Sequence, residues 1–133
     1  MREPIRPQAI TEFLSGLQEG SLRLQVGSIS GQAQFYPRAL NLGSVADPLY
    51  TTTATGKATL MACTVVRSGS DLPRPVPYWF AMIRLEEGPR ILGILDGDPA
   101  TTPPRIGCSV FVQHHPGELP PFTFRLADGE QQA

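Results

Sequence analysis

The chain has 133 residues, of which 41% are hydrophobic, and this suits one domain with a modest core. Its net charge of −1 and pI near 6.1 exclude a general attraction to phosphates, so nucleic-acid binding would need a local basic patch. The sequence has no apolar run long enough to span a membrane, and its N-terminus lacks the apolar core of a signal peptide. We therefore expect a cytoplasmic protein with no membrane partner.

The first expected element is a helix over residues 8–19. Its apolar residues recur at the i, i+3, i+4, i+7 spacing of one helix face, and Gly20 suits its C-terminal end. This face packs on the rest of the chain or docks on a partner, and the sequence leaves both alternatives open. Phe13 and Leu17, which lie on this face, are therefore candidate partner-binding residues.

Two short strands with turns follow the helix. Residues 22–26 alternate in polarity and predict one strand, and residues 33–36 predict a second strand that Pro37 ends. Turns are expected at residues 27–31 and 41–48. These segments outline a small ribbon made of two hairpins.

Five further strands are expected in the second half of the chain. The expected ranges are 57–67, 78–86, 90–95, 109–114 and 122–126. The first three form a meander, and a long connection precedes the last two, which fits a small Greek-key barrel. The expected fold class is mainly β, with an N-terminal helix, a small hairpin segment and a five-stranded barrel of the oligonucleotide/oligosaccharide-binding (OB) fold.

The sequence points to no catalytic centre. Cys63 and Cys108 lie in apolar runs without an activating histidine or helix N-terminus, so buried reduced thiols are expected. His114 and His115 suit a strand end, with a ligand or catalytic role as the alternative. No Gly-x-Ser-x-Gly nucleophile elbow occurs. We therefore expect that the chain is not itself an enzyme.

An aromatic segment is the best candidate for a partner surface. Tyr36, Pro37 and Arg38 lie on an expected exposed turn and combine an aromatic ring, a rigid bend and a bidentate donor. Phe35 extends this patch. The alternatives for the aromatic residues of the chain are core packing and base stacking, but stacking needs interleaved basic residues, and the strand at 78–86 offers only Arg84.

Five segments, taken in order, resemble a known family. They read TEFLSGLQEGSLRLQ, QFYPR, TGKATLMACTVV, RLEEGPRILGIL and RIGCSVFV. This order is similar to that of small proteins that join a rubredoxin-like zinc ribbon to an acyl-CoA-associated OB fold, over nearly the whole chain. The resemblance implies an N-terminal arm and helix, a ribbon segment, a barrel and a polar tail. The implied boundaries are 1–21, 22–56, 57–127 and 128–133.

The chain departs from that family at the metal site. The family's pattern implies two pairs of zinc-binding cysteines, and these would fall at Gly27 and Ser30 and at Asn41 and Ser44. Ser and Asn oxygens are poor ligands for zinc, so we expect a degenerate ribbon with no bound metal and no other cofactor held by the chain alone. Because a structural zinc contributes on the order of 10 kcal/mol to a small fold, its loss implies support from elsewhere, such as a permanent partner.

Members of this family are accessory subunits of enzymes that act on acyl-CoA thioesters. The resemblance implies a noncatalytic subunit in a hetero-oligomer with a thiolase-superfamily enzyme, in lipid, steroid side-chain or polyketide-like metabolism. Acyl-CoA at the interface with that enzyme is a further expectation. Two alternatives stay open, an OB-fold binder of single-stranded nucleic acid and a subunit of an enoyl-CoA hydratase complex.

Overall fold

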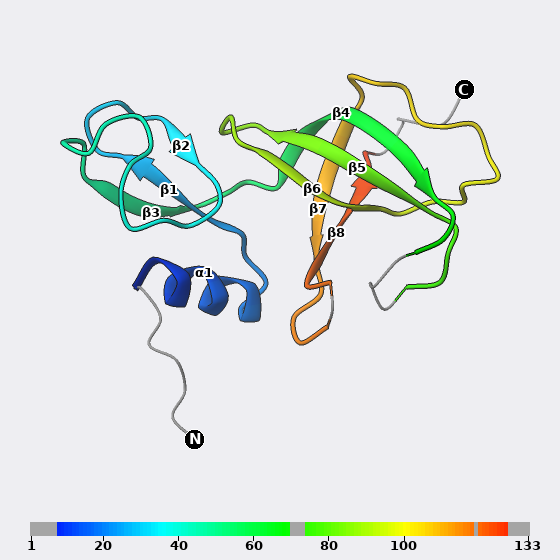
Figure 1. The fold of residues 1–133 in the computed structure, drawn as a ribbon, viewed down its shortest axis with the longest axis horizontal. Helices are drawn as coiled ribbons and strands as arrows, with labels where there is room; N and C mark the ends of the chain where they lie inside the picture. The colour runs from blue at the N-terminus through cyan, green and yellow to red at the C-terminus, as the bar shows by residue number, and fades with distance from the viewer. Residues whose placement is uncertain (1–7, 70–73, 119, 128–133) are drawn as a thin grey trace.

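The protein is described from a computed structural model that covers residues 8–69, 74–118 and 120–127 (Figure 1). The expected N-terminal arm before residue 8 and the polar tail at 128–133 lie outside this range. Within it, the chain forms one helix, a three-stranded antiparallel sheet and a closed five-stranded barrel, which confirms the expected fold class. In the part of the chain that the structure describes, no helix has the length and apolar character that crossing a membrane requires.

Helix α1 (Gln8–Gln18) ends one residue before the predicted end at residue 19. Gly20 adopts a φ of 81°, and its N–H donates to the Leu17 carbonyl at 3.2 Å. The Ser21 N–H donates to the Gly16 carbonyl at 2.8 Å, which completes the usual glycine-terminated helix end. Leu17 is 9% exposed and joins the hydrophobic core, so the apolar face of α1 packs on its own chain.

The small sheet has one more strand than the sequence analysis predicted. Strand β1 (Arg23–Gly27) lies between β2 (Ala33–Gln34) and β3 (Leu49–Thr53), and both pairings are antiparallel. β3 was not predicted because its residues are mostly exposed and show no alternation of polar and apolar side chains. The ribbon is therefore a three-stranded sheet rather than two separate hairpins.

The five barrel strands agree with the predicted ranges to within one residue. They are β4 (Lys57–Val66), β5 (Tyr78–Leu85), β6 (Arg90–Leu95), β7 (Ser109–His114) and β8 (Phe122–Leu126). The barrel closes in the order β4-β5-β6-β8-β7, with β6 parallel to β8 and the other pairs antiparallel. This connectivity is that of an OB-type Greek-key barrel.

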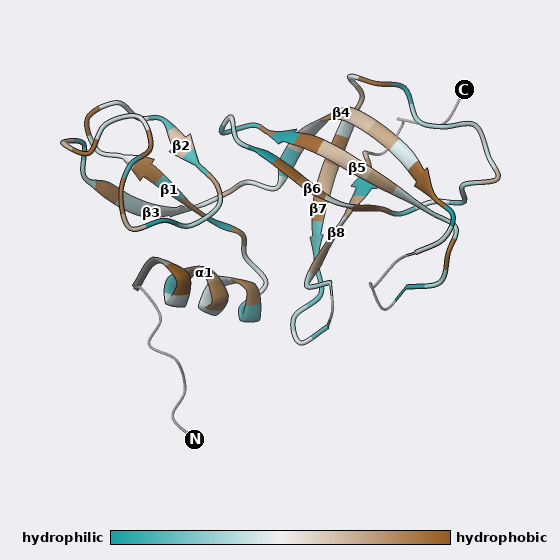
Figure 2. Ribbon diagram, in the orientation of Figure 1, coloured by the Kyte–Doolittle hydropathy of each residue, from teal (hydrophilic) through white to brown (hydrophobic). Residues whose placement is uncertain are grey.

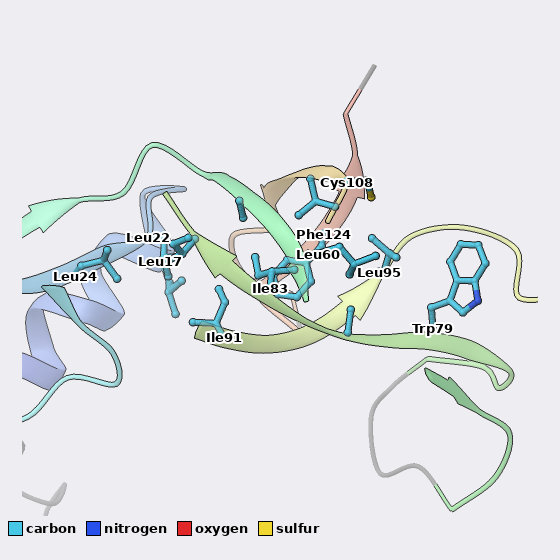
Figure 3. Close-up of a cluster of buried hydrophobic side chains, with 14 residues drawn as sticks. Leu17, Leu22, Leu24, Leu60, Trp79, Ile83, Ile91, Leu95, Cys108 and Phe124 are labelled. Atoms are coloured by element: carbon cyan, nitrogen blue, oxygen red, sulfur yellow. The ribbon is translucent and has the colours of Figure 1, made fainter. Parts of the chain in front are cut away.

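The barrel, the helix and the small sheet share one hydrophobic core (Figure 3). The alternation along β5 turns one face inward, and every residue of that face is at most 2% exposed. The inward residues are Trp79, Ala81, Ile83 and Leu85. Leu24 of β1 and Leu22, which precedes that strand, belong to the same cluster, so packing on the barrel supports the ribbon from within the chain.

Candidate functional site

Three of the four positions that the resemblance assigned to zinc ligands meet in space. Gly27 ends β1, Ser30 lies in the following turn and Asn41 belongs to the next loop. A Cβ atom built on Gly27 would overlap Asp47 Oδ2 and would lie 2.5 Å from Ser30 Oγ and 2.7 Å from Asn41 Nδ2. The two loops therefore converge on one point, and a carboxylate lies at that point.

Asp47 bonds to both loops. Its carboxylate accepts the Ile29 N–H at 2.7 Å, the Ser30 N–H at 3.1 Å and the Asn41 Nδ2 amide at 3.1 Å. These donors, the Ile29 N–H foremost, hold the pKa of the Asp47 carboxyl below its usual value of 3.8. Asp47 is only 6% exposed, and it stays ionised because its oxygens are so well supplied with hydrogen bonds.

Sequence reasoning missed Asp47, although a signal was available. It is the only acidic residue between Glu19 and Asp71, and it stands in the same predicted turn as Asn41 and Ser44. Ser44, the fourth predicted position, forms hydrogen bonds within its own turn. Its carbonyl accepts the Asp47 N–H at 3.1 Å, and its Oγ accepts the Ala46 N–H at 3.3 Å.

Two glutamines extend this polar network toward the rest of the second loop. Gln25, 8% exposed, donates from Nε2 to the Arg38 carbonyl at 2.6 Å and accepts the Arg38 N–H at 2.7 Å through Oε1. Gln34 donates to the Leu40 carbonyl at 3.2 Å and accepts the Leu42 N–H at 3.0 Å. The Gln34 amide also donates to Gln25 Oε1 at 3.0 Å, which joins the two side chains.

We call this whole network the polar clasp. It consists of the side chains of Gln25, Ser30, Gln34, Asn41 and Asp47. Its donor set holds one carboxylate and otherwise only neutral oxygen and nitrogen groups, which does not fit zinc. Among the described residues, no group of three or more His, Cys, Asp or Glu side chains is placed to hold a metal ion.

The structure brings together part of the predicted partner-binding set. The rings of Phe13 and Phe35 lie 5.5 Å apart between centroids, and the ring of Tyr36 lies 4.1 Å from that of Phe35. Phe13, Phe35 and Pro37 line a small crevice between α1 and the ribbon. Tyr36 is 52% exposed.

The two remaining members of the set differ in exposure. Arg38 is exposed on the loop, whereas Leu17 is turned into the core. Contact of any of these residues with a partner stays a prediction.

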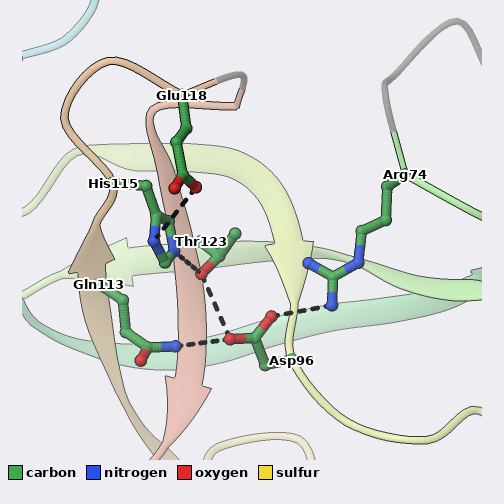
Figure 4. Close-up of polar contacts among 6 residues, drawn as sticks. All are labelled: Arg74, Asp96, Gln113, His115, Glu118 and Thr123. Atoms are coloured by element: carbon green, nitrogen blue, oxygen red, sulfur yellow. Dashed lines mark hydrogen bonds and ion pairs between the residues drawn. The ribbon is translucent and has the colours of Figure 1, made fainter.

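A second polar cluster lies at the ends of β6, β7 and β8 (Figure 4). It consists of Arg74, Asp96, Gln113, His115, Glu118 and Thr123. His115 Nε2 lies 2.8 Å from Thr123 Oγ1, and His115 Nδ1 lies 3.9 Å from a Glu118 oxygen. This order of hydroxyl, imidazole and carboxylate is that of a catalytic triad, but Thr123 is 3% exposed and also bonds to Asp96, so its hydroxyl is closed to substrate. The cluster ties the strand ends together.

The outer face of β4, β5 and β6 carries a shallow apolar groove of about 170 Å³. Its lining includes Cys63, Phe80, Met82 and Leu92 and no charged side chain. OB folds bind oligonucleotides on the corresponding central strands, where basic side chains contact the phosphates. The lining of this groove supplies no basic side chain. Burial, together with the neighbouring Cys108, raises the pKa of the Cys63 thiol, so the groove also lacks a reactive thiolate.

Comparison with known proteins places this architecture. Residues 51–120 match the family model for the C-terminal OB-fold domain of ChsH2. The solved structure named Ltp2-ChsH2(DUF35) aldolase is similar over 93% of this chain and 98% of that chain, with a TM-score of 0.75 and 18% identity. A DUF35-family protein of unknown function from Sulfolobus solfataricus is similar over 90% of this chain and 86% of its own, with a TM-score of 0.64 and 15% identity.

No curated protein sequence matches the chain at a significant level. The structural likenesses, at such low identity, show the shared fold. The family model covers more than half of the chain by itself, and it includes the end of β3 and four of the five barrel strands, β4 to β7. The chain therefore belongs to the family of the ChsH2 C-terminal OB-fold domain.

Proposed function

We propose that this chain is a noncatalytic accessory subunit that binds a thiolase-superfamily enzyme and supports its action on acyl-CoA thioesters. The observation that carries the proposal is the family match of residues 51–120, joined to a fold shared over 93% of the chain with a structure named as an aldolase of Ltp2 and ChsH2(DUF35). The shared fold includes the ribbon, which the family model leaves mostly outside. A hetero-oligomer with a thiolase-like enzyme is the arrangement that this likeness supports.

The chemistry of the described residues supports a role without catalysis. Thr123, whose hydroxyl lies 2.8 Å from His115 Nε2, is only 3% exposed, and the raised pKa of Cys63 keeps that thiol protonated near neutral pH. A catalytic residue has to reach its substrate in the state of ionisation that the reaction needs. The reacting groups would therefore come from the partner enzyme, and this chain would supply shape and stability at the acyl-CoA site.

Binding of single-stranded nucleic acid has weaker support. Affinity for nucleic acid depends on phosphate contacts by lysine and arginine. The groove across the central barrel strands is lined by apolar residues, and the net charge of the chain is −1. Neither observation supplies the cations that such a ligand requires.

Affinity purification from the native host tests the proposal. The full-length chain would carry a small tag, and co-purifying proteins would be identified by mass spectrometry and quantified against the chain. We expect a thiolase-superfamily enzyme in stoichiometric amount. Its turnover of a β-ketoacyl-CoA, or its retro-aldol cleavage of a β-hydroxyacyl-CoA, should fall when the chain is removed.

Two outcomes would contradict the proposal. Recovery of the chain alone as a stable monomer would remove the accessory role. Stoichiometric recovery with an enoyl-CoA hydratase, and activity of that complex with enoyl-CoA alone, would replace the thiolase-superfamily enzyme as the partner.

A further inference from the structure

Exposed apolar side chains gather on the ribbon, most of them in its loops. Of the nine large hydrophobic side chains that are exposed in the described part of the chain, six lie between residues 29 and 50. They are Ile29, Tyr36, Leu40, Leu42, Val45 and Tyr50. Ile29 is 78% exposed, Val45 77% and Leu42 67%. Figure 2 shows apolar segments in these loops, at the end of the molecule away from the barrel.

We call four of these side chains the ribbon-tip patch. It consists of Ile29, Leu40, Leu42 and Val45. They come from two loops that converge on Asp47. The Ile29 N–H of the first loop and the Asn41 side chain of the second both donate to the Asp47 carboxylate. The patch is therefore formed by neighbouring loops, and grouped apolar exposure of this kind marks interaction sites.

The loops carry their polar groups inside and their apolar groups outside. The Ile29 N–H donates to Asp47, the Leu42 N–H donates to Gln34, and the Leu40 carbonyl accepts from Gln34. Burial of apolar surface stabilises a fold by roughly 25 cal/mol per Å². A chain that stays alone in water would therefore be more stable with these apolar side chains turned inward. Because the polar clasp fixes the loop backbone in advance, less ordering entropy is lost when a partner covers the patch.

The charge of this segment indicates what kind of surface would cover it. Between Leu24 and Gly56 the sequence has two charged residues, Arg38 and Asp47, and Asp47 is buried in the clasp. Besides the four apolar side chains of the patch, this segment exposes Tyr36, Tyr50 and one arginine, Arg38. This is the composition of an interface centre, from which lysine and acidic residues are depleted. A second copy of the chain fits less well, because this segment offers no exposed carboxylate to pair with Arg38 across a symmetric contact.

We propose that the ribbon-tip patch is the surface with which this chain docks on its acyl-CoA enzyme. The enzyme would present an apolar hollow for Leu42 and Ile29 and a carboxylate facing Arg38. This inference rests on the proposed function and adds to it the surface through which the two proteins meet. It also gives the polar clasp a role, since the clasp holds the docking loops in place.

Pairwise co-expression with defined partners tests the docking surface. The probes are the thiolase-superfamily enzymes encoded in the same genome, each co-expressed with the full-length tagged chain, and the dissociation constant of any complex is then measured by calorimetry. The test variants are Ile29→Gln and Leu42→Gln. The matched controls are Ile106→Gln and Leu92→Gln, since Ile106 is 56% exposed in a turn of the barrel and Leu92 is 47% exposed in its groove.

We expect Ile29→Gln and Leu42→Gln to raise the dissociation constant about tenfold or more, because truncated anchor residues at interface centres have effects of that size. The two control variants should bind within about threefold of the wild type. Circular dichroism should show the same fold for all four, as these side chains are exposed.

Each other result has a defined meaning. If the wild type binds an enzyme and the patch variants bind equally well, the docking surface is wrong while the proposed function stands. If Leu92→Gln or Ile106→Gln alone abolishes binding, the barrel face is the interface and the inference is overturned. If none of the enzymes binds the wild type, the proposed function fails. Self-association that Leu42→Gln removes would then identify a second copy as the occupant and would overturn the choice of partner.

Discussion

An alanine at Gly27 would place a methyl group inside the polar clasp. Gly27 does not have a positive φ, so the backbone accepts alanine without strain. The new Cβ would overlap Asp47 Oδ2 and would also lie too close to Ser30 Oγ, at 2.5 Å, and to Asn41 Nδ2, at 2.7 Å. The carboxylate would have to withdraw, and its bonds to Ile29 and Ser30 would lengthen.

The expected loss of stability follows from two opposing terms. Overpacking of a filled site costs about 1–3 kcal/mol, and replacing a strand glycine by alanine returns roughly 0.5–1 kcal/mol. The net change in the free energy of unfolding for Gly27→Ala is then a loss of about 0.5–2 kcal/mol. For a chain of this length this corresponds to a fall in Tm of roughly 2–8 °C.

Urea denaturation followed by circular dichroism measures this loss, and a double-mutant cycle assigns it. In the Asp47→Ala background the same Gly27→Ala change should cost less, because the nearest of the three clashing groups, the Asp47 carboxylate, is gone. Gly43→Ala in the second loop is the matched control, since its added Cβ would lie 3.3 Å from the nearest atom, Asn41 Oδ1. An equal cost of Gly27→Ala in both backgrounds, or a gain in stability, would refute the clasp as the reason for this glycine.

Three further predictions concern single residues. Because the folded pKa of Asp47 lies below 3.8, its charged form stabilises the fold above that pH, and this stabilisation is lost as pH falls through the folded pKa. The stability advantage of wild type over Asp47→Asn should therefore shrink from about pH 6 to about pH 3. A pH-independent difference in urea midpoints between the two proteins would contradict this. Gly93→Ala should cost about 1–3 kcal/mol in urea denaturation, because the new Cβ would lie 2.9 Å from the ring of the fully buried Phe124, and an unchanged midpoint would argue against so tight a barrel core. Cys63 should react with iodoacetamide several-fold more slowly in the folded chain than in urea at about pH 8, because burial raises its pKa, and equal rates would show an open thiol.

The barrel was predictable because its strands alternate. On β5 the fully buried Trp79 and Ile83 fall on one face, and the exposed Arg84 falls on the other. This two-residue period and the length of the segment both identify a strand. Strand β3 gave no such signal, since its threonines and Tyr50 are largely exposed and it owes its place to pairing with β1. A strand that is held by its neighbour and not by a buried face is hard to recognise from its own residues.

The ribbon site was predictable in position but not in chemistry. The spacing drawn from the family resemblance led to Gly27, Ser30 and Asn41, which do meet, but Asp47 lies outside that spacing. Its contact with Ile29 joins residues 18 apart in the chain, and no local pattern marks such a contact. The helix shows the same limit, because the apolar face that includes Leu17 was visible in the sequence while the surface it packs on was not.

Zinc content is the most direct test of the claim that a carboxylate-centred clasp, without metal, holds the docking loops in place. The full-length chain would be produced in zinc-supplemented medium, purified without chelators and analysed by plasma mass spectrometry next to its protein concentration. We predict far less than one zinc per folded chain, and circular dichroism that chelator treatment leaves unchanged. One zinc per chain, retained through dialysis and required for the fold, would contradict the account.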